Sequence, residues 1–304
     1  MKRIVPFLTL LVFTLTAACG GDSAAPSASG GSIPSLTAAS GASATAAAPQ
    51  RIVSLSPTAT ETLYAIGAGK QVIAVDDQSN YPPEAPKTDL SGYTPNIEAI
   101  AAKKPDLVVI STDTGGLKAK LEALKITVVQ QDAVTNLDDA YRQIVELGKA
   151  TGRDKEAAAT VAAMQTSVAA SIRSVSKFAV PVKVFHELDN TLYSASSKSF
   201  IGALYKLVGL ENIADAADKS GTGYPQLSAE YVISQNPELI FLADTKCCGQ
   251  NVKTVGARPG WSDLKAVKSG SVIELDDDVA SRWGPRTPLL LEAIASAATK
   301  IVRS

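Results

Sequence analysis

From residue 51 onward, two patterns of hydrophobic and polar residues alternate along the chain. Short, continuous apolar runs such as Leu107–Ile110 are typical of strands that are buried on both faces. Between them lie segments whose apolar residues recur every three or four positions, as on the buried side of a helix. Strands are predicted at residues 51–55, 72–75, 107–110, 127–129, 182–185 and 239–243, and helices at 57–66, 97–102, 117–124 and 200–208. Since strands and helices alternate, the sheets should be parallel and the fold should be of the α/β class.

The longest helical pattern lies in the middle of the chain. Residues 152–178 contain no proline and, after Gly152, no glycine, and their apolar residues from Val161 to Phe178 are spaced by three and four. One amphipathic helix about 35 to 40 Å long is therefore expected, at a rise of about 1.5 Å per residue. By itself, such a helix would also fit the surface of a single domain.

The segment after this helix repeats the first half of the chain. Residues 228–242 align without gaps on residues 96–110. An internal repeat of this kind predicts two copies of one structural unit. The expected fold has two similar Rossmann-like lobes with mostly parallel sheets, at residues 50–150 and 180–304, joined by one long helix at residues 151–179.

The N-terminal residues have the features of a secretory signal, because two basic residues precede an apolar run that is too short to span a bilayer. The run ends in Leu15-Thr16-Ala17-Ala18-Cys19, which resembles the lipobox of bacterial lipoproteins, although Thr16 stands where Leu is commoner. The resemblance implies a signal peptide at residues 1–18 and lipidation of Cys19. The alternative is ordinary cleavage after Ala18, which would leave a free thiol.

Residues 19–49 begin with Cys19 and then consist almost entirely of Ala, Ser, Gly, Thr and Pro. Such a segment buries too little apolar surface to offset chain entropy, so a flexible tether is predicted. The whole chain has a formal net charge of −1, which provides no basic field to attract nucleic acid. We expect an exported monomer, anchored by its lipid to the outer face of the cell membrane or in the periplasm.

Several different short motifs occur across residues 50–302 in a particular order and spacing. They are residues 51–57 with Glu61, Tyr81-Pro82-Pro83, Asn96-Ile97-Glu98, residues 104–108, Tyr224-Pro225-Gln226-Leu227-Ser228 with Glu230, and Gly284-Pro285-Arg286. Together they resemble the iron-chelate and cobalamin substrate-binding family of ABC importers. The resemblance implies two lobes that flank one long helix, a ligand held between them, and one carboxylate per lobe that docks onto arginines of a dimeric permease.

Glu98 and Glu230 occupy equivalent positions in the two repeats, so a pseudo-twofold protein would present both to a twofold permease. The resemblance implies that these are the docking carboxylates. The alternative is that each acid only interacts with the dipole of its own helix, which is worth about 0.3 to 1 kcal/mol. Glu61 is different, because it completes a T-x-x-E pattern that begins at Thr58 and is predicted to form a structural capping box.

Ligands of open parallel sheets bind beyond the carboxyl ends of the strands, so the loops there hold the candidate binding residues. These residues are Tyr81, Tyr93, His186, Tyr193, Tyr224, Arg282, Trp283 and Arg286, and Glu187 lies in the same region. Aromatic rings suit flat macrocycles, and guanidinium groups suit carboxylates or phosphates. The resemblance places Tyr93, Tyr193 and Tyr224 where cobalamin-binding relatives carry aromatic residues, and Arg282 in their cleft-facing last loop. The alternative is that about half of these rings only pack loops onto the core.

His186 is the only histidine of the chain and is expected to leave its strand toward the ligand. There it would ligate cobalt or iron, hydrogen-bond a ligand, or be inert. Relatives of the resembled family also ligate haem with a tyrosine and a histidine, so Tyr93 with His186 makes haem an alternative to a corrinoid, and a siderophore is a further alternative. No cofactor of the protein's own is expected, because the cobalt or iron would belong to the ligand.

Cys247 and Cys248 follow a predicted strand in a loop that should face the ligand. In an exported protein, we expect the two thiols to oxidise together into a vicinal disulfide, which would offer an apolar platform to a flat ligand. A metal site is a weaker alternative, because no CxxC or Cys/His spacing accompanies the pair.

The candidate function is a substrate-binding lipoprotein that captures a cobalamin-like corrinoid or an iron chelate and delivers it to an ABC permease. A cell-surface enzyme is the main alternative from another class. The chain has no G-x-S-x-G, H-E-x-x-H or phosphate-loop motif, so no catalytic residue is predicted. A surface adhesion lipoprotein is a second alternative, but it would need an exposed interaction face rather than a repeated ligand-binding unit.

Overall fold

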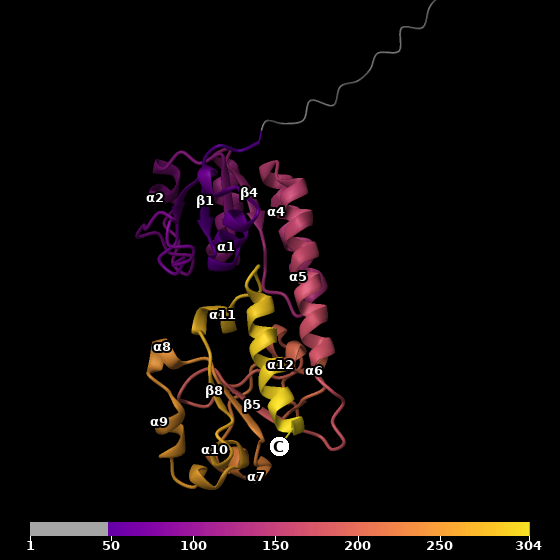
Figure 1. Cartoon of the computed structure of the whole chain (residues 1–304). Helices are drawn as coiled ribbons and strands as arrows, with labels where there is room; N and C mark the ends of the chain where they lie inside the picture. Colours follow the sequence, from indigo (N-terminus) through magenta and orange to yellow (C-terminus); the bar gives the residue numbers. More distant parts are fainter. Residues whose placement is uncertain (1–47, 304) are drawn as a thin grey trace, which may run out of the picture. The chain divides into compact units, whose positions relative to one another are not determined.

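The computed structural model describes residues 48–303 (Figure 1). The predicted signal peptide, Cys19 and nearly all of the predicted tether lie outside these residues. The described residues belong to one compact unit. Within the described part, no helix is both long enough and apolar enough to cross a membrane.

The first lobe is built on a parallel sheet with the strand order β2-β1-β3-β4. Its strands are β1 (Ile52–Leu55), β2 (Val72–Val75), β3 (Leu107–Ile110) and β4 (Thr127–Gln130), and its helices are α1 (Pro57–Ala65), α2 (Ile97–Ala102) and α3 (Leu117–Ala123). Apolar side chains of β1 and β3 alternate between two cores, one on each face of the sheet. This is why the strands appear in the sequence as continuous apolar runs.

The second lobe has a parallel sheet with the strand order β6-β5-β7-β8. Its strands are β5 (Lys183–Glu187), β6 (Glu211–Asn212), β7 (Leu239–Leu242) and β8 (Val272–Glu274). Its helices are α6 (Phe200–Leu207), α7 (Ala229–Gln235), α8 (Thr245–Cys248), α9 (Val252–Gly256), α10 (Lys265–Lys268), α11 (Asp277–Ser281) and α12 (Thr287–Arg303). Two further cores cover the two faces of this sheet.

The internal repeat is visible in the backbone as well as in the strand order. Lys104 and Asn236 occupy equivalent positions before a proline, and both have positive φ, 50° and 48°. The acids that follow these prolines also act alike: Asp106 accepts a hydrogen bond from the amide of Arg51 at 3.0 Å, and Glu238 accepts one from the amide of Lys183 at 2.8 Å. The predicted fold, two similar α/β lobes with parallel sheets, is confirmed.

Within the segment predicted as one linking helix, residues 151–179, lies the long helix α5 (Asp154–Ser174), which is shorter at both ends. A second helix that was not predicted, α4 (Leu137–Thr151), precedes it and packs along it. Gly152, with a φ of 69°, ends α4 in the left-handed conformation that favours glycine, and Val175 is already extended.

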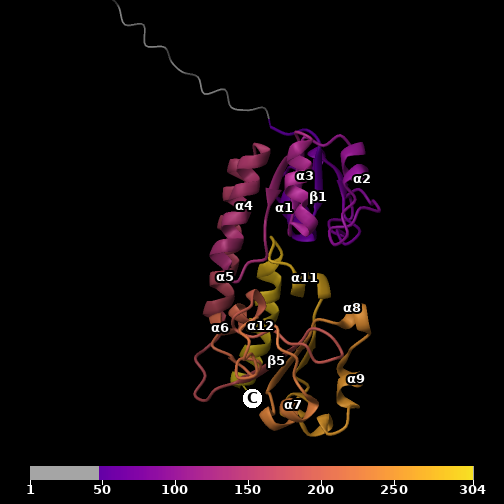
Figure 2. The same ribbon diagram turned by 180° about the vertical axis from the view of Figure 1, so that it is seen from behind.

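Helix α5 joins the lobes through its packing. It contributes Ala157 and Met164 to a core of the first lobe and Val168 to a core of the second. Figures 1 and 2 show α5 beside α4 and α12, in agreement with the extensive contacts of α5 with both helices. A helix buried against both lobes favours small lobe movements over large ones.

Candidate functional site

The four predicted tyrosines all lie on segments that follow strand carboxyl ends, and all four are exposed. In the first lobe, Tyr81 and Tyr93 lie between β2 and α2, with exposed fractions of 43% and 79%. In the second lobe, Tyr193 and Tyr224 are 41% and 46% exposed. A bridge between Tyr193 and Gln226 brings the segments of these two tyrosines together. Because ligands of parallel sheets bind beyond the carboxyl ends of the strands, these exposed tyrosines remain candidates for ligand contact.

A small polar cavity of about 120 Å³ adjoins Tyr93 in the first lobe. It is lined by Leu55, Pro57, Asp76, Gly92, Tyr93, Ser111, Thr112 and Thr114. Burial raises the pKa of Asp76, and Ser79 donates a hydrogen bond to its carboxylate at 2.5 Å. The cavity can accommodate one small polar group and lies at the carboxyl ends of β1, β2 and β3.

Glu61 is a buried anchor for two arginines rather than part of a capping box. The N-cap of α1 is Ser56, whose hydroxyl accepts from the amide of Ala59 at 3.3 Å, because Pro57 takes the first helical position. The predicted capping box from Thr58 is therefore wrong. The Glu61 carboxylate instead accepts from Arg282 at 2.7 Å and from Arg286 at 2.5 and 2.8 Å.

The guanidinium groups of Arg282 and Arg286 were expected to face a ligand, and the structure corrects this expectation. Arg282 is buried, and besides Glu61 it donates to the Gln78 carbonyl and to Asp278. Arg286 lies over the ring of Tyr81, with its Cζ 4.1 Å from the ring centroid. Both guanidinium groups thus donate hydrogen bonds within the protein, where they connect the second lobe to Glu61 of the first.

Trp283 lies between these arginines in the sequence and is half-buried. Its indole N–H donates to the side-chain carbonyl of Gln143 in α4 at 2.9 Å. Its ring packs against a core of the second lobe. The predicted ligand-binding tryptophan therefore also has a structural contact with the linking helices.

The prediction that His186 leaves its strand toward the ligand is wrong. His186 lies within β5, is completely buried, and its Nδ1 is 2.6 Å from the hydroxyl of Tyr205. Burial lowers its pKa to about 3, so the imidazole is neutral at physiological pH. The His186 side chain is completely buried and its ring lies against Tyr205, which belongs to a core of the second lobe, so it points into the core. Within the described residues, no group of three or more His, Cys, Asp or Glu side chains is placed to hold a metal ion.

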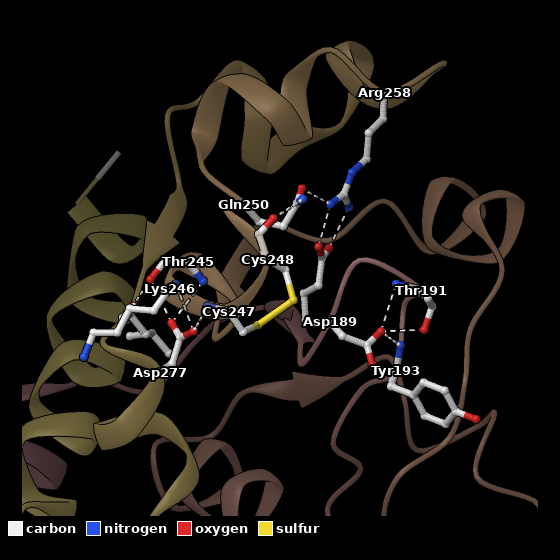
Figure 3. Close-up of a disulfide and its surroundings, with 12 residues drawn as sticks. Asp189, Thr191, Tyr193, Thr245, Lys246, Cys247, Cys248, Gln250, Arg258 and Asp277 are labelled. Atoms are coloured by element: carbon white, nitrogen blue, oxygen red, sulfur yellow. Dashed lines mark hydrogen bonds and ion pairs between the residues drawn. A yellow bond between two sulfur atoms is a disulfide. The ribbon is translucent and has the colours of Figure 1, made fainter. Parts of the chain in front are cut away.

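The structure contains the disulfide between Cys247 and Cys248 (Figure 3). The pair ends α8, directly after β7, and Cys247 is exposed while Cys248 is half-buried. Figure 3 shows the disulfide between Asp277 and the turn that runs from Asp189 to Tyr193. This turn follows β5, which pairs in parallel with β7, so the turn and the disulfide lie beyond the same carboxyl end of the sheet.

A largely buried charge cluster lies at the carboxyl ends of β5 and β7, and the sequence pattern indicates little of it. Glu187, which was expected to face the ligand, is fully buried and accepts two hydrogen bonds from Arg258, at 2.5 and 2.6 Å. Arg258 also donates to Gln250 at 2.7 Å. Asp244 is fully buried beside Glu187, and burial together with the charge of Glu187 raises the pKa of Asp244 to about 7. The only hint in the sequence was a pair of acids at the ends of two apolar strands.

Replacing Asp244 with Asn is expected to make the stability of the protein less dependent on pH. The folded-state pKa of Asp244 lies above its ordinary value of 3.8, so the folded state binds the proton more tightly and the wild type loses stability as pH rises from about 4 to about 7. Asn carries no proton to lose, so Asp244→Asn should match the wild type at about pH 4 and exceed it at pH 8 by about 1.4 kcal/mol per unit of pKa shift, a few kcal/mol in all. Urea unfolding at both pH values measures this difference, with exposed Glu122→Gln as the control. An equal gain at both pH values would contradict the titration of Asp244.

Glu98 and Glu230 are presented alike by the two lobes. Each is the second residue of its helix, α2 or α7, and both are exposed. Asn96 and Ser228 cap these helices by accepting from the amides of Ala99 and Tyr231, so the two acids stand on equivalent, fixed turns. A hydrogen bond from the backbone at the helix start lowers the pKa of Glu230.

A family model described as periplasmic binding protein matches residues 52–279 of this chain. The match spans both lobes and most of the chain, as the repeated parallel sheets and the linking helices would require. The protein belongs to this periplasmic binding protein family.

Curated relatives support the same classification over most of the chain. An uncharacterized ABC transporter substrate-binding lipoprotein, YvrC of Bacillus subtilis, is 31% identical over 83% of this chain and 80% of its own length. A vitamin B12-binding protein of Pectobacterium atrosepticum is 32% identical over 82% of this chain and 88% of its own length. Among solved structures, the periplasmic vitamin B12 binding protein BtuF of Vibrio cholerae matches with a TM-score of 0.69 and 26% identity, over 84% of this chain and 98% of that one.

Proposed function

We propose that this protein is the substrate-binding lipoprotein of an ABC importer and that it captures a cobalamin-like corrinoid between its two lobes. The observation that carries the proposal is the set of four exposed tyrosines at the carboxyl ends of the two sheets, two from each lobe. Aromatic faces from opposite sides suit a large, flat macrocycle. The relatives with named ligands that match most of this chain are vitamin B12-binding proteins, which supports the same ligand class.

The charges near the tyrosines favour a corrinoid over a ferric catecholate. A catecholate complex with three negative charges needs several free cations, but Arg282 and Arg286 are already bound to Glu61. The haem alternative is weakened for a different reason. It required Tyr93 and His186 as a pair of ligands, and His186 is buried in the core of the second lobe.

Delivery of the ligand requires a surface that a permease can recognise from both lobes. Glu98 and Glu230 meet this requirement, because they are exposed and stand on equivalent turns of the two repeats. A permease with twofold symmetry would bind them with one arginine-containing surface from each half. We assign the docking role to this pair.

The remaining parts of the proposal concern the cellular context. The protein is exported and held at the outer face of the membrane or in the periplasm by a lipid on Cys19, in line with the lipoprotein among its relatives. It acts as a monomer, has no catalytic activity and no cofactor of its own, and the metal that it carries belongs to the ligand.

Titration of the full-length protein in detergent with cyanocobalamin is expected to quench its tryptophan fluorescence in a saturable way at micromolar concentration or below. The chain has two tryptophans, of which Trp261 is buried and Trp283 is half-buried beside the predicted ligand-binding residues. Haemin and a panel of ferric siderophores are titrated in parallel, with correction for the absorption of each ligand. Trp283→Phe should lose most of the quenching, and calorimetry measures its affinity separately, because Trp283 is itself a predicted ligand-binding residue.

The pattern of responses decides between ligand classes. Saturable binding of haemin or of one siderophore, without cyanocobalamin binding, would replace the corrinoid in the proposal with that ligand. No binding to any of the three classes by calorimetry would contradict the proposal that this site takes metal chelates.

A further inference from the structure

The vicinal disulfide occupies a position where parallel-sheet proteins bind their ligands. Helix α8 begins three residues after the end of β7, and ligands of such sheets lie beyond the carboxyl ends of the strands. The neighbouring loop, after β5, carries Tyr193, which is 41% exposed. The disulfide and the ring of Tyr193, which are both partly exposed, therefore lie at the same carboxyl end of the second sheet, as Figure 3 shows.

The turn that carries the disulfide is already fixed by other groups. The Asp277 carboxylate accepts hydrogen bonds from the amides of Thr245, Lys246 and Cys247 at 2.9 to 3.0 Å, and from the Thr245 hydroxyl at 2.8 Å. On its other side, Gln250 is held by Arg258 at 2.7 Å. Since backbone amides and carboxylates already hold this turn, a disulfide is not needed to fix it, and the exposed position of Cys247 needs another explanation.

The chemistry of the sulfur pair suits contact with a flat, weakly polar surface. Divalent sulfur is polarisable, carries no charge, and gains about 0.3 to 1.5 kcal/mol against an aromatic ring. A disulfide between adjacent residues also restrains both side chains, so that little side-chain entropy is lost when a ligand covers them. The Asp189 carboxylate accepts from the amide of Thr191 at 2.8 Å and so fixes the turn before Tyr193 in a similar way.

We propose that the Cys247–Cys248 disulfide and Tyr193 form one platform on the second lobe, against which the flat face of the ligand packs. This inference rests on the proposed function, because it names the surface of the second lobe that recognises the macrocycle. It assigns to the sulfur pair a role in ligand affinity that is separate from the stability of the fold.

The first test compares ligand affinity in the wild type and in the Cys247→Ser/Cys248→Ser variant, both full-length in detergent. Cyanocobalamin and haemin are the probes, and calorimetry measures the dissociation constant. The double variant is expected to bind the ligand of the wild type at least tenfold more weakly, whereas exposed Lys253→Ala in the same lobe should bind it as the wild type does. Equal affinity in the wild type and the double variant overturns the platform and leaves the proposed function intact. No binding of either probe by the wild type overturns both.

The second test uses only the wild type and so does not depend on how well a variant folds. A water-soluble phosphine reduces the disulfide to two thiols and takes up an oxygen atom from water to become its oxide. The rate is followed by alkylation and mass spectrometry of the peptide that contains Cys247 and Cys248, which separates it from Cys19. Saturation with the bound ligand is expected to slow this reduction at least tenfold, because the ligand covers the sulfur atoms. A rate that is unchanged by a saturating ligand overturns the platform.

Discussion

Replacing Glu98 and Glu230 together with alanine is expected to abolish uptake of the ligand by cells while leaving its affinity for the isolated protein unchanged. Both side chains are exposed at the second position of equivalent helices, so their removal leaves both cores and all four tyrosines in place. Under the proposed docking, uptake would depend on two charge-assisted contacts with the permease, one from each lobe. Each single variant should retain part of the uptake, because one docking contact remains. The measurement is accumulation of labelled cyanocobalamin in cells whose only copy of the gene carries the variant.

The matched control removes two other exposed carboxylates, again one from each lobe. Glu122 lies in α3 and Glu211 in β6, and both are exposed. The Glu122→Ala/Glu211→Ala variant changes the net charge by the same amount and should transport normally. Normal transport by the Glu98/Glu230 variant would refute the docking assignment, and reduced transport by the control variant would show that overall charge, rather than these two positions, governs the interaction.

The elements that the sequence predicted well are those whose pattern is local. The bounds of β2, β3 and α2 agree with the predicted residues, because each has a continuous apolar run or a capped, periodic turn of its own. The internal repeat then predicted the second lobe from the first. Helix α4, in contrast, was not predicted. The sequence analysis began its long helix at Gly152 and assigned no element to residues 137–151, although Gly152 in the left-handed conformation marks the end of a helix there.

The candidate site was predicted less completely, because its polar groups find partners that are far apart in the sequence. Glu61 and Arg282 are 221 residues apart, and no local pattern relates them. The error at His186 has another cause. A polar residue near the end of an apolar strand was assumed to lie beyond the sheet, whereas the hydroxyl of Tyr205 satisfies its Nδ1 inside the core. Tyr81, Tyr93 and Tyr193 do follow the strands that the sequence predicted. Strand β6, which precedes Tyr224, was not predicted, and the cysteine pair lies in the short helix α8 rather than in a loop.

The buried contact between the lobes leads to the largest expected change in stability. Glu61→Gln keeps the size of the side chain but removes its charge, which leaves Arg286 without its carboxylate partner and Arg282 with Asp278 alone, in a largely buried position. Removal of one member of a buried ion pair typically costs about 3 to 5 kcal/mol, because the remaining charge is neither hydrated nor paired. We therefore expect Glu61→Gln to lower the free energy of unfolding by about this amount, measured by urea unfolding, which adds no salt.

The control for this variant is an ion pair on the surface. Asp263 and Lys268 are 2.8 Å apart, and their side chains are 82% and 61% exposed. Asp263→Asn removes the same chemical group but leaves the remaining lysine in water, so it should change the free energy of unfolding very little. If Glu61→Gln is as stable as Asp263→Asn, the buried network does not hold the lobes together. A second result separates the two roles. If Glu61→Gln is destabilised as expected but its folded molecules still bind cyanocobalamin with wild-type affinity, the arginines stabilise the contact between the lobes. Ligand contact would then be left to the tyrosines and the disulfide.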